Sequence, residues 1–247
     1  LDSFYSKKKI SIYLGNSGSS ARMLAGLLST FPKKILLKGD KSLNKRDMSR
    51  IFQLEKFGAS FSPKNKTKLP LYITGSELPV ADRFTESLGS AQVKSSLIFG
   101  ALSSYGQTVI TEQVKSRDHT EIMLKELGAK IINTDVISIE PLKKPLDTFE
   151  ISIPGDPSSA AFFAAAAAML PNSDLLIKNV LANPTRIGFY SILKNMGAAI
   201  AGANALTGEV AIINSTISDN TCEICTNDDM NGKNVIEVKN EKLIIIN

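Results

Sequence analysis

Three Gly/Ser-rich segments in the chain have the composition of helix starts, and helix starts can bind anions. Their central residues are Gly18 with Asn16 beside it, Ser90 with Gln92, and Asp156 followed by Pro157. A helix N-terminus exposes unpaired N–H groups and carries partial positive charge, so it attracts phosphate or carboxylate. At the third segment we expect Asp156 to cap the helix with its own carboxylate and to repel a second anion. The first two segments are therefore the candidate ligand sites, and a simple capped turn is the alternative at each.

A positively charged side chain recurs near the start of each predicted second helix. The three side chains lie 12, 11 and 11 positions before a Gly-Ala pair and belong to Arg46, Arg117 and Arg186. An Arg at a helix start interacts unfavourably with the helix dipole, so an Arg at all three helix starts indicates a specific role. The planar guanidinium suits phosphate or carboxylate. A structural bond to a nearby carboxylate explains each Arg equally well, and the candidates are Asp40, Asp118 and Glu121.

An internal repeat organises these features. From the first small polar residue to the closing glycine, the three copies span 39, 38 and 39 residues (Ser19 to Gly58, Ser90 to Gly128 and Ser158 to Gly197). Each copy is predicted to hold a helix after the Gly/Ser segment, a strand, a second helix that ends at the glycine, and a further strand. The predicted strands are 34–38, 107–111, 130–133, 175–180 and 199–201, and after Gly208 also 209–214, 221–226, 234–239 and 243–246.

The apolar segment Ala160–Leu170 indicates how these units pack. A helix without a polar face is expected to be buried on all sides. The sequence therefore predicts an α/β fold of repeated two-helix plus sheet units, with buried parallel helices inside and sheets outside. The pair Pro154-Gly155 and the lysine- and proline-rich stretch before it indicate a boundary. We expect two domains, residues 1–153 with two units and residues 154–247 with one.

The composition is that of a globular protein with a sizeable core, because 43% of the residues are apolar and 21% are charged. The longest apolar run, Ala160–Leu170, is shorter than the about 20 residues that a membrane-spanning helix needs, so we expect no membrane association. The net charge of +5 is compatible with a nucleic acid or an anionic small molecule as partner. No RNA-binding aromatic motif or zinc finger accompanies the lysine clusters, so we interpret them as solvated and expect no nucleic-acid partner.

The two cysteines, Cys222 and Cys225, do not make a metal site. A zinc ion takes about four ligands, and the single histidine, His119, is far away in sequence. We expect both thiols to be reduced residues of a strand in a cytoplasmic protein, with no metal bound. His119 is interpreted as a helix-start residue with local hydrogen bonds.

Several sequence blocks, in this order, closely resemble the 3-phosphoshikimate 1-carboxyvinyltransferase (EPSP synthase) family, in its class with a Ser-Ala-Gln triplet. The blocks are Leu14 to Arg22, Gly39 to Arg46, Ser90 to Ser95, Ser116 to Glu121, Gly155 to Phe162 and Asn183 to Arg186. The resemblance covers nearly all of residues 10–200. It implies an inside-out α/β barrel of repeated units in two lobes. The predicted domains would then be two units of the first lobe and a truncated first unit of the second.

The resemblance also implies the reaction: transfer of the enolpyruvyl group from phosphoenolpyruvate to the 5-hydroxyl of shikimate 3-phosphate, in the shikimate pathway of aromatic amino acid biosynthesis. No metal or organic cofactor is expected. Carried over by position, Asn16 and Gly18 lie against phosphoenolpyruvate and Arg46 clamps its anionic groups. Ser90, Ala91 and Gln92 hold shikimate 3-phosphate, with Gln92 reaching both ligands, and Arg117 is a neighbour of that phosphate. Arg22 and Arg186 match the family pattern but are interpreted as structural.

The chain departs from the family pattern at both ends. Nothing before Leu14 matches the family's opening Lys-Ser pair and Arg, and residues 209–247 show no counterpart of its catalytic Asp, Lys and Glu. The catalytic residues are therefore unknown, and the chain resembles the middle of the enzyme. We expect an incomplete enzyme with little or no activity alone, monomeric if complete. A non-catalytic, anion-binding remnant is the alternative. UDP-N-acetylglucosamine enolpyruvyl transferase is a second one, disfavoured because both cysteines fall in the wrong unit.

Overall fold

The computed structural model describes residues 10–170, 173–198, 200–204, 209–212 and 243–246. The chain divides into two compact units, unit 1 from Leu1 to Phe149 and unit 2 from Glu150 to Asn247. The assignment of the predicted domains 1–153 and 154–247 to two lobes stays a prediction.

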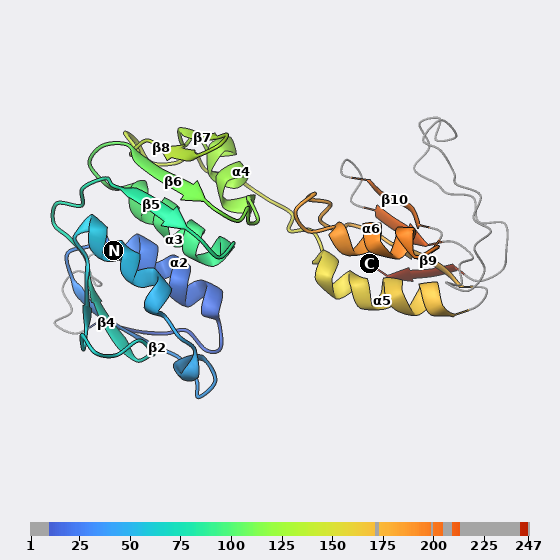
Figure 1. Ribbon diagram of the computed structural model, residues 1–247, viewed down its shortest axis with the longest axis horizontal. Coiled ribbons are helices and arrows are strands. Elements are labelled where there is room, and N and C mark those ends of the chain that lie inside the picture. The colour runs from blue at the N-terminus through green and yellow to red at the C-terminus, as the bar shows by residue number, and fades with distance from the viewer. Residues whose placement is uncertain (1–9, 171–172, 199, 205–208, 213–242, 247) are drawn as a thin grey trace. The chain divides into compact units, whose positions relative to one another are not determined.

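The first half of unit 1 combines the helix α2 with a mixed sheet (Figure 1). Its elements are β1 (Ile10–Tyr13), α2 (Gly18–Leu28), β2 (Lys34–Lys38), the 3₁₀ helices η1 (Leu43–Lys45) and η2 (Ser49–Phe57), β3 (Ser60–Ser62) and β4 (Leu71–Thr74). The strand order is β1-β2-β4-β3, with β1 and β2 parallel and the other pairs antiparallel. Strand β2 forms where predicted, and its alternation buries Ile35 and Leu37.

The second half of unit 1 repeats this topology. Its elements are β5 (Arg83–Glu86), α3 (Ala91–Ala101), β6 (Thr108–Glu112), α4 (His119–Glu126), β7 (Ile131–Asn133) and β8 (Ile137–Ile139). The strand order β5-β6-β8-β7 has the same pairing, with the first pair parallel and the others antiparallel. The predicted repeat of helix, strand, helix and strand is therefore confirmed here.

Unit 2 builds a third copy from the described parts of its chain. Its elements are α5 (Pro157–Met169), β9 (Asp174–Ile177), α6 (Gly188–Asn195), β10 (Ile200–Asn204), β11 (Glu209–Ile212) and β12 (Leu243–Ile246). Strand β12 pairs parallel with β9, while β9, β11 and β10 pair antiparallel. Strand β12 is thus the parallel edge strand of its sheet, as β1 and β5 are in the two sheets of unit 1. The predicted strands 221–226 and 234–239, with Cys222 and Cys225, lie outside the described residues.

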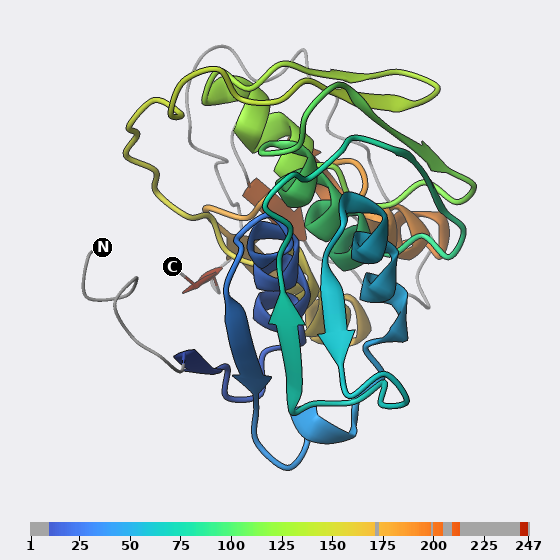
Figure 2. The ribbon, with the colours of Figure 1, turned by 90° about the vertical axis from the view of Figure 1, so that its left-hand side faces the viewer.

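Helices α2 and α3 lie between the two sheets of unit 1 (Figures 1 and 2). Their backbones approach so closely that a Cβ on Gly26 would stand 2.1 Å from the carbonyl oxygen of Ser96. Helix α3 buries nearly its whole length, including Leu97 and Ile98. This arrangement confirms the predicted α/β architecture with helices inside and sheets outside, and it brings the two helix starts of unit 1 together.

One local prediction is wrong. Helix α5 is not buried on all sides: its alanine face packs against β9 and α6, whereas Phe162 on the other face is 79% exposed. An absence of polar residues does not supply the neighbours needed to bury a helix. The second helix of the first repeat forms where predicted, as the 3₁₀ helix η2, and ends at Gly58. The glycines that end the second helices do adopt the predicted left-handed backbone, with φ of 91°, 89° and 98° at Gly58, Gly128 and Gly197.

Candidate anion-binding site

The start of α2 is a capped helix N-terminus. Ser17 is the N-cap, and its hydroxyl accepts a hydrogen bond from the Ser20 N–H at 3.1 Å. Gly18, the first helical residue, is buried under two guanidinium groups. A Cβ there would stand 3.1 Å from Nη1 of Arg22 and 3.1 Å from Nη1 of Arg46. The absence of a side chain at Gly18 therefore lets both cations reach the helix end.

Arg46 is tied to the loop before α2. It caps η1, and its Nη2 donates to Oδ1 of Asn16 at 2.8 Å. The three residues that the sequence predicted on the phosphoenolpyruvate side are thus in contact or near contact, since Arg46 touches Asn16 and covers Gly18. The hydrogen bond that the structure shows for Arg46 thus goes to the amide of Asn16, and not to one of the carboxylates that the sequence analysis considered.

Gln92 joins α3 to α2. Its Oε1 accepts from Nη1 of Arg22 at 2.6 Å, and its Nε2 donates to the Ser19 hydroxyl at 2.7 Å. Arg22 also donates to the Asp47 carbonyl at 3.0 Å. The predicted residues Asn16, Gly18, Arg46 and Gln92 therefore belong to one cluster across the two helix starts, and Arg22 links its two halves.

The start of α3 is also capped. The hydroxyl of Ser90 accepts from the Val93 N–H, and Ala91 is the first helical residue. The N–H of Ser90 donates to Oε2 of Glu86, a carboxylate that is itself buried. Ser90 and Ala91 are half-buried at the edge of this helix end, next to Gln92. All three residues of the Ser-Ala-Gln triplet thus surround one helix N-terminus.

The electrostatics of the cluster are cationic. Burial lowers the pKa of Arg22, and the neighbouring charges of Arg50 and Arg46 lower it further, while Asp47 opposes them. Asp47 itself is held ionised, because a hydrogen bond from Ser49 lowers its pKa. Three guanidinium groups against one carboxylate leave excess positive charge at the start of α2. Such an excess is stabilised by an anion.

Arg117 lies outside the bonded cluster. It is an exposed residue in the loop between β6 and α4, two positions before His119. The third repeated Arg is structural: Nη2 of Arg186 contacts Oδ1 of Asp156 at 2.5 Å and the Ser158 hydroxyl at 2.8 Å. Asp156 caps α5 as predicted, and Pro157 takes the first helical position. Of the two readings for the repeated Arg, the structural one therefore holds at Arg186.

Sequence reasoning missed two partners in the cluster and one buried charge beneath it. Ser19 and Arg22 follow Gly18 by one and four positions, so the helical period places them at the same end of α2. Lys94 is wholly buried on α3 between two carboxylates. A lysine inside a helix that is predicted to be buried was the available signal.

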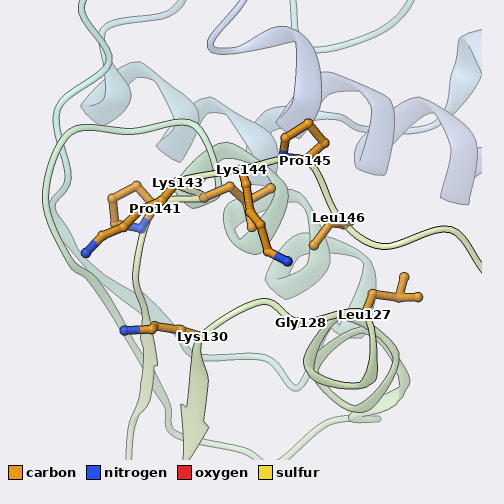
Figure 3. Close-up of a pocket in the computed structure, with 9 residues that line it drawn as sticks. Leu127, Gly128, Lys130, Pro141, Lys143, Lys144, Pro145 and Leu146 are labelled. Atoms are coloured by element: carbon orange, nitrogen blue, oxygen red, sulfur yellow. The ribbon is translucent and has the colours of Figure 1, made fainter.

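The described residues offer other features that bear on function. They contain no group of three or more His, Cys, Asp and Glu side chains that could hold a metal ion. Among the same residues, no helix is both long and apolar enough to span a membrane. A pocket of about 120 Å³ lies at the far end of α4, between Gly128 and the 141–146 stretch (Figure 3). Its walls are leucine and proline carbons with lysines at the rim, and the helix starts are not part of it.

Comparison with known proteins identifies the class and then the family. The EPSP synthase (3-phosphoshikimate 1-carboxyvinyltransferase) family profile matches residues 1–238. A 3-phosphoshikimate 1-carboxyvinyltransferase of Helicobacter pylori (strain HPAG1) is 50% identical over 188 residues, which are 75% of this chain and 44% of that protein. The one from Endomicrobium trichonymphae is 44% identical over 198 residues, 79% of this chain and 46% of that protein.

Solved structures agree. An EPSP synthase from Acinetobacter baumannii superposes with a TM-score of 0.74 at 36% identity, over 83% of this chain and 48% of that one. The repeated α/β units and this likeness define the class: the chain has an EPSP-synthase-type α/β fold. The chain belongs to the EPSP synthase family, which confirms the resemblance in the sequence. It spans about half the length of the curated relatives it matches.

Proposed function

We propose that this chain forms part of an enzyme that transfers the enolpyruvyl group of phosphoenolpyruvate to the 5-hydroxyl of shikimate 3-phosphate, releasing phosphate. Family membership supports the reaction type. The observation that carries the proposal is the bonded cluster of Asn16, Arg46, Arg22 and Gln92 across the starts of α2 and α3. Two anionic substrates need two adjoining anion sites, and two helix starts joined by guanidinium groups supply them.

Each half of the cluster has its own substrate in this proposal. Phosphoenolpyruvate lies at the start of α2, where Arg46 binds its anionic groups and Gly18, which has no side chain, lets the guanidinium groups of Arg22 and Arg46 lie against the helix end. Shikimate 3-phosphate lies at the start of α3, where Ser90 and the backbone at Ala91 face its phosphate. Gln92 stands between the two halves and touches both ligands. Arg117 approaches the phosphate from its loop.

The chemistry beyond binding needs groups that protonate the methylene carbon and accept the hydroxyl proton. The catalytic residues of the proposed enzyme are unknown in this chain. The proposed reaction uses no metal or organic cofactor, and its partners are the two metabolites rather than nucleic acid or membrane. A monomeric enzyme in the cytoplasm completes the proposal.

Titration calorimetry tests the proposal on the 247-residue chain. We expect each of phosphoenolpyruvate and shikimate 3-phosphate to bind, and Arg46→Ala to weaken phosphoenolpyruvate binding by about 1.5–3 kcal/mol, the value of a hydrogen bond to a charged group. Arg83→Ala is the matched control, because Arg83 is an exposed cation on β5 of the same unit and stands apart from the cluster. It should leave both affinities unchanged. Equal losses in the two variants would overturn the site.

The length of the chain favours a second reading, because it spans about half of its curated relatives. In that reading the chain is an anion-binding part of the enzyme without turnover of its own. A coupled phosphate-release assay separates the two. Release at a normal rate supports the full reaction in this chain, whereas binding without release supports the binding part alone. Turnover of UDP-N-acetylglucosamine in place of shikimate 3-phosphate would assign the chain to the other enolpyruvyl transferase.

A further inference from the structure

A buried ion network lies directly beneath the start of α3. The side chain of Lys94, two residues after Gln92, has no exposed surface. Its Nζ stands 3.2 Å from Oε1 of Glu112 and 2.7 Å from Oε1 of Glu121, and both carboxylates are almost fully buried. The three residues come from α3, the end of β6 and the first turn of α4, which lie together in unit 1 (Figure 1).

Burying this ion network has a large desolvation cost. Buried ion pairs contribute little to stability compared with apolar residues of the same volume, because each ion loses its hydration. One lysine here faces two carboxylates, and burial raises the pKa of Glu121 although Lys94 acts to lower it. A network with one carboxylate in excess therefore contributes little to the stability of the fold. Its effect lies in fixing the positions of α3, β6 and α4 relative to one another.

The network and its neighbours fix both ends of the loop that carries Arg117. Glu112 accepts hydrogen bonds from the N–H of Ser116 at 3.0 Å and from its hydroxyl at 2.6 Å, which holds the loop that carries Arg117. The far end of that loop is fixed by Glu121 and by a buried bond of 2.6 Å between the hydroxyls of Ser95 and Thr120. The loop at Arg117 is thus anchored to α3 through Lys94.

We propose that Lys94 is a positioning residue for the phosphate-bearing substrate. Through Glu112 and Glu121 it holds the Arg117 loop at a fixed distance from Ser90 and Gln92, so that both sides of the phosphate site are preorganised. This proposal rests on the proposed function, because it takes shikimate 3-phosphate as the ligand of α3. It does not extend to phosphoenolpyruvate, whose residues Asn16 and Arg46 lie in the other half of unit 1.

The test compares ligand affinities in variants of the full chain. Lys94→Met removes the cation and leaves two buried carboxylates. Glu121→Leu is the second variant, and it keeps the test available if Lys94→Met fails to fold. It leaves Lys94 paired one-to-one with Glu112, so the core gains no unpaired charge. Leu97→Ala is the matched control, since Leu97 is fully buried one turn further along α3 and its truncation destabilises the helix without touching the network.

We expect Glu121→Leu, and Lys94→Met where it folds, to raise the Kd for shikimate 3-phosphate about tenfold or more, the size of effect seen when supporting partners of a binding group are removed. The Kd for phosphoenolpyruvate should change less than about twofold. Leu97→Ala should lower Tm and leave both constants unchanged. These values are measured by calorimetry well below each variant's Tm.

Two failures are distinguishable. If Gln92→Ala and Ser90→Ala leave shikimate 3-phosphate affinity unchanged in the parent chain, the proposed function is wrong at α3. If those variants weaken binding but Glu121→Leu binds as tightly as the parent chain, the proposed function stands and Lys94 has no positioning role. Equal weakening of both ligands by Glu121→Leu, or weakening by Leu97→Ala of the same size, likewise overturns the positioning role.

Discussion

The guanidinium groups of Arg46 and Arg22 orient the two amides of the cluster. A guanidinium only donates hydrogen bonds, so each must face an amide oxygen. Arg46 faces Oδ1 of Asn16, and Arg22 faces Oε1 of Gln92. The amide nitrogens of both side chains are then turned away from the cations, and Nε2 of Gln92 points to Ser19. Donors fixed in this way suit anionic ligands.

A methyl group at Gly18 tests how tightly the cations approach the helix end. In Gly18→Ala the new Cβ meets Nη1 of both Arg22 and Arg46 at 3.1 Å, so the guanidinium groups must shift by a few tenths of an ångström. We expect weaker binding of phosphoenolpyruvate, with Tm nearly unchanged because the displaced atoms are ends of flexible side chains. Calorimetry and thermal melting of the same sample check this. An unchanged affinity would place the ligand elsewhere.

A negative charge at Gln92 tests the electrostatic argument. The carboxylate in Gln92→Glu keeps its bond to Arg22 but neutralises one cation and repels anions. We therefore expect a larger loss of shikimate 3-phosphate affinity than in Gln92→Ala, and a loss that shrinks as salt is added because the repulsion is screened. Titrations at low and high ionic strength measure both effects. The reverse order of the two variants would contradict the cationic character of the site.

At the residue scale, the sequence predicted most members of the cluster but not the hydrogen bonds between them. Ser17, Ser90 and Asp156 cap their helices, and of these the sequence analysis predicted the cap at Asp156, because capping is set by local sequence. The bond from Arg22 to Gln92 joins residues 70 positions apart. No local pattern encodes such a contact, so Arg22 was read as structural only.

The elements repeat more strictly than the sequence does. Each sheet has a parallel pair followed by two antiparallel strands, although in unit 2 the parallel partner, β12, comes from the far end of the chain. The sequence predicted β2, β6, β7 and β9 to within a few residues. It missed β1, β3, β4, β5 and β8, which are strands of three or four residues. An alternation this short is a weak signal, since β4 and β5 do bury every second residue.

The close approach of α2 and α3 predicts a strong effect at Gly26. In Gly26→Ala the Cβ would collide with the Ser96 backbone, so the helices must separate. Overpacking of this kind costs about 1–3 kcal/mol. Gly188→Ala is the control, because its Cβ meets no atom within 4 Å and Ala favours the helix. Chemical denaturation should show destabilisation in the first variant only. Equal stability of the two would mean that the helices are not in contact at Gly26.

The cap of α5 predicts an acid-sensitive element. Burial alone would raise the pKa of Asp156, but the Ser158 N–H and Arg186 outweigh it and lower the pKa below its ordinary 3.8. A carboxylate with a lowered pKa stabilises the fold above its unfolded value and loses that contribution as the pH falls through its folded value. Asp156→Asn keeps the cap and removes the titration. Melting from pH 6 to pH 3 should therefore show less acid loss in Asp156→Asn than in the parent chain. Parallel curves of Tm against pH for the two proteins would show that Asp156 does not cause the acid sensitivity.

The molecule as a whole has an apolar surface on unit 2. Phe162, Phe163 and Met169 of α5 are exposed together with Ile192 and Met196 of α6. Large apolar side chains exposed in this number promote association. We expect the 247-residue chain to self-associate as its concentration rises, and Phe162→Ser to reduce this in light scattering. Tyr105→Ser, a change at a single exposed ring of unit 1, is the control and should have no effect. Identical scattering of all three would contradict the prediction.

At the scale of the whole molecule, the repeat and the family could be predicted from the sequence, because motif order and spacing survive in it. The exposure of α5 could not, because burial depends on neighbours and the helix's own residues do not reveal them. The role of Lys94 was equally out of reach, since its two carboxylates lie 18 and 27 positions further on (112 − 94 and 121 − 94).

In the proposed site, the starts of α2 and α3 together hold two anions. This arrangement can be tested by following the backbone amide resonances of the isotope-labelled chain by NMR while shikimate 3-phosphate and phosphoenolpyruvate are added. We expect the largest shifts at Gly18, Ser19, Ala91 and Gln92. Largest shifts at Lys130, Lys143 and Lys144 around the pocket of Figure 3, or no shifts at all, would contradict it.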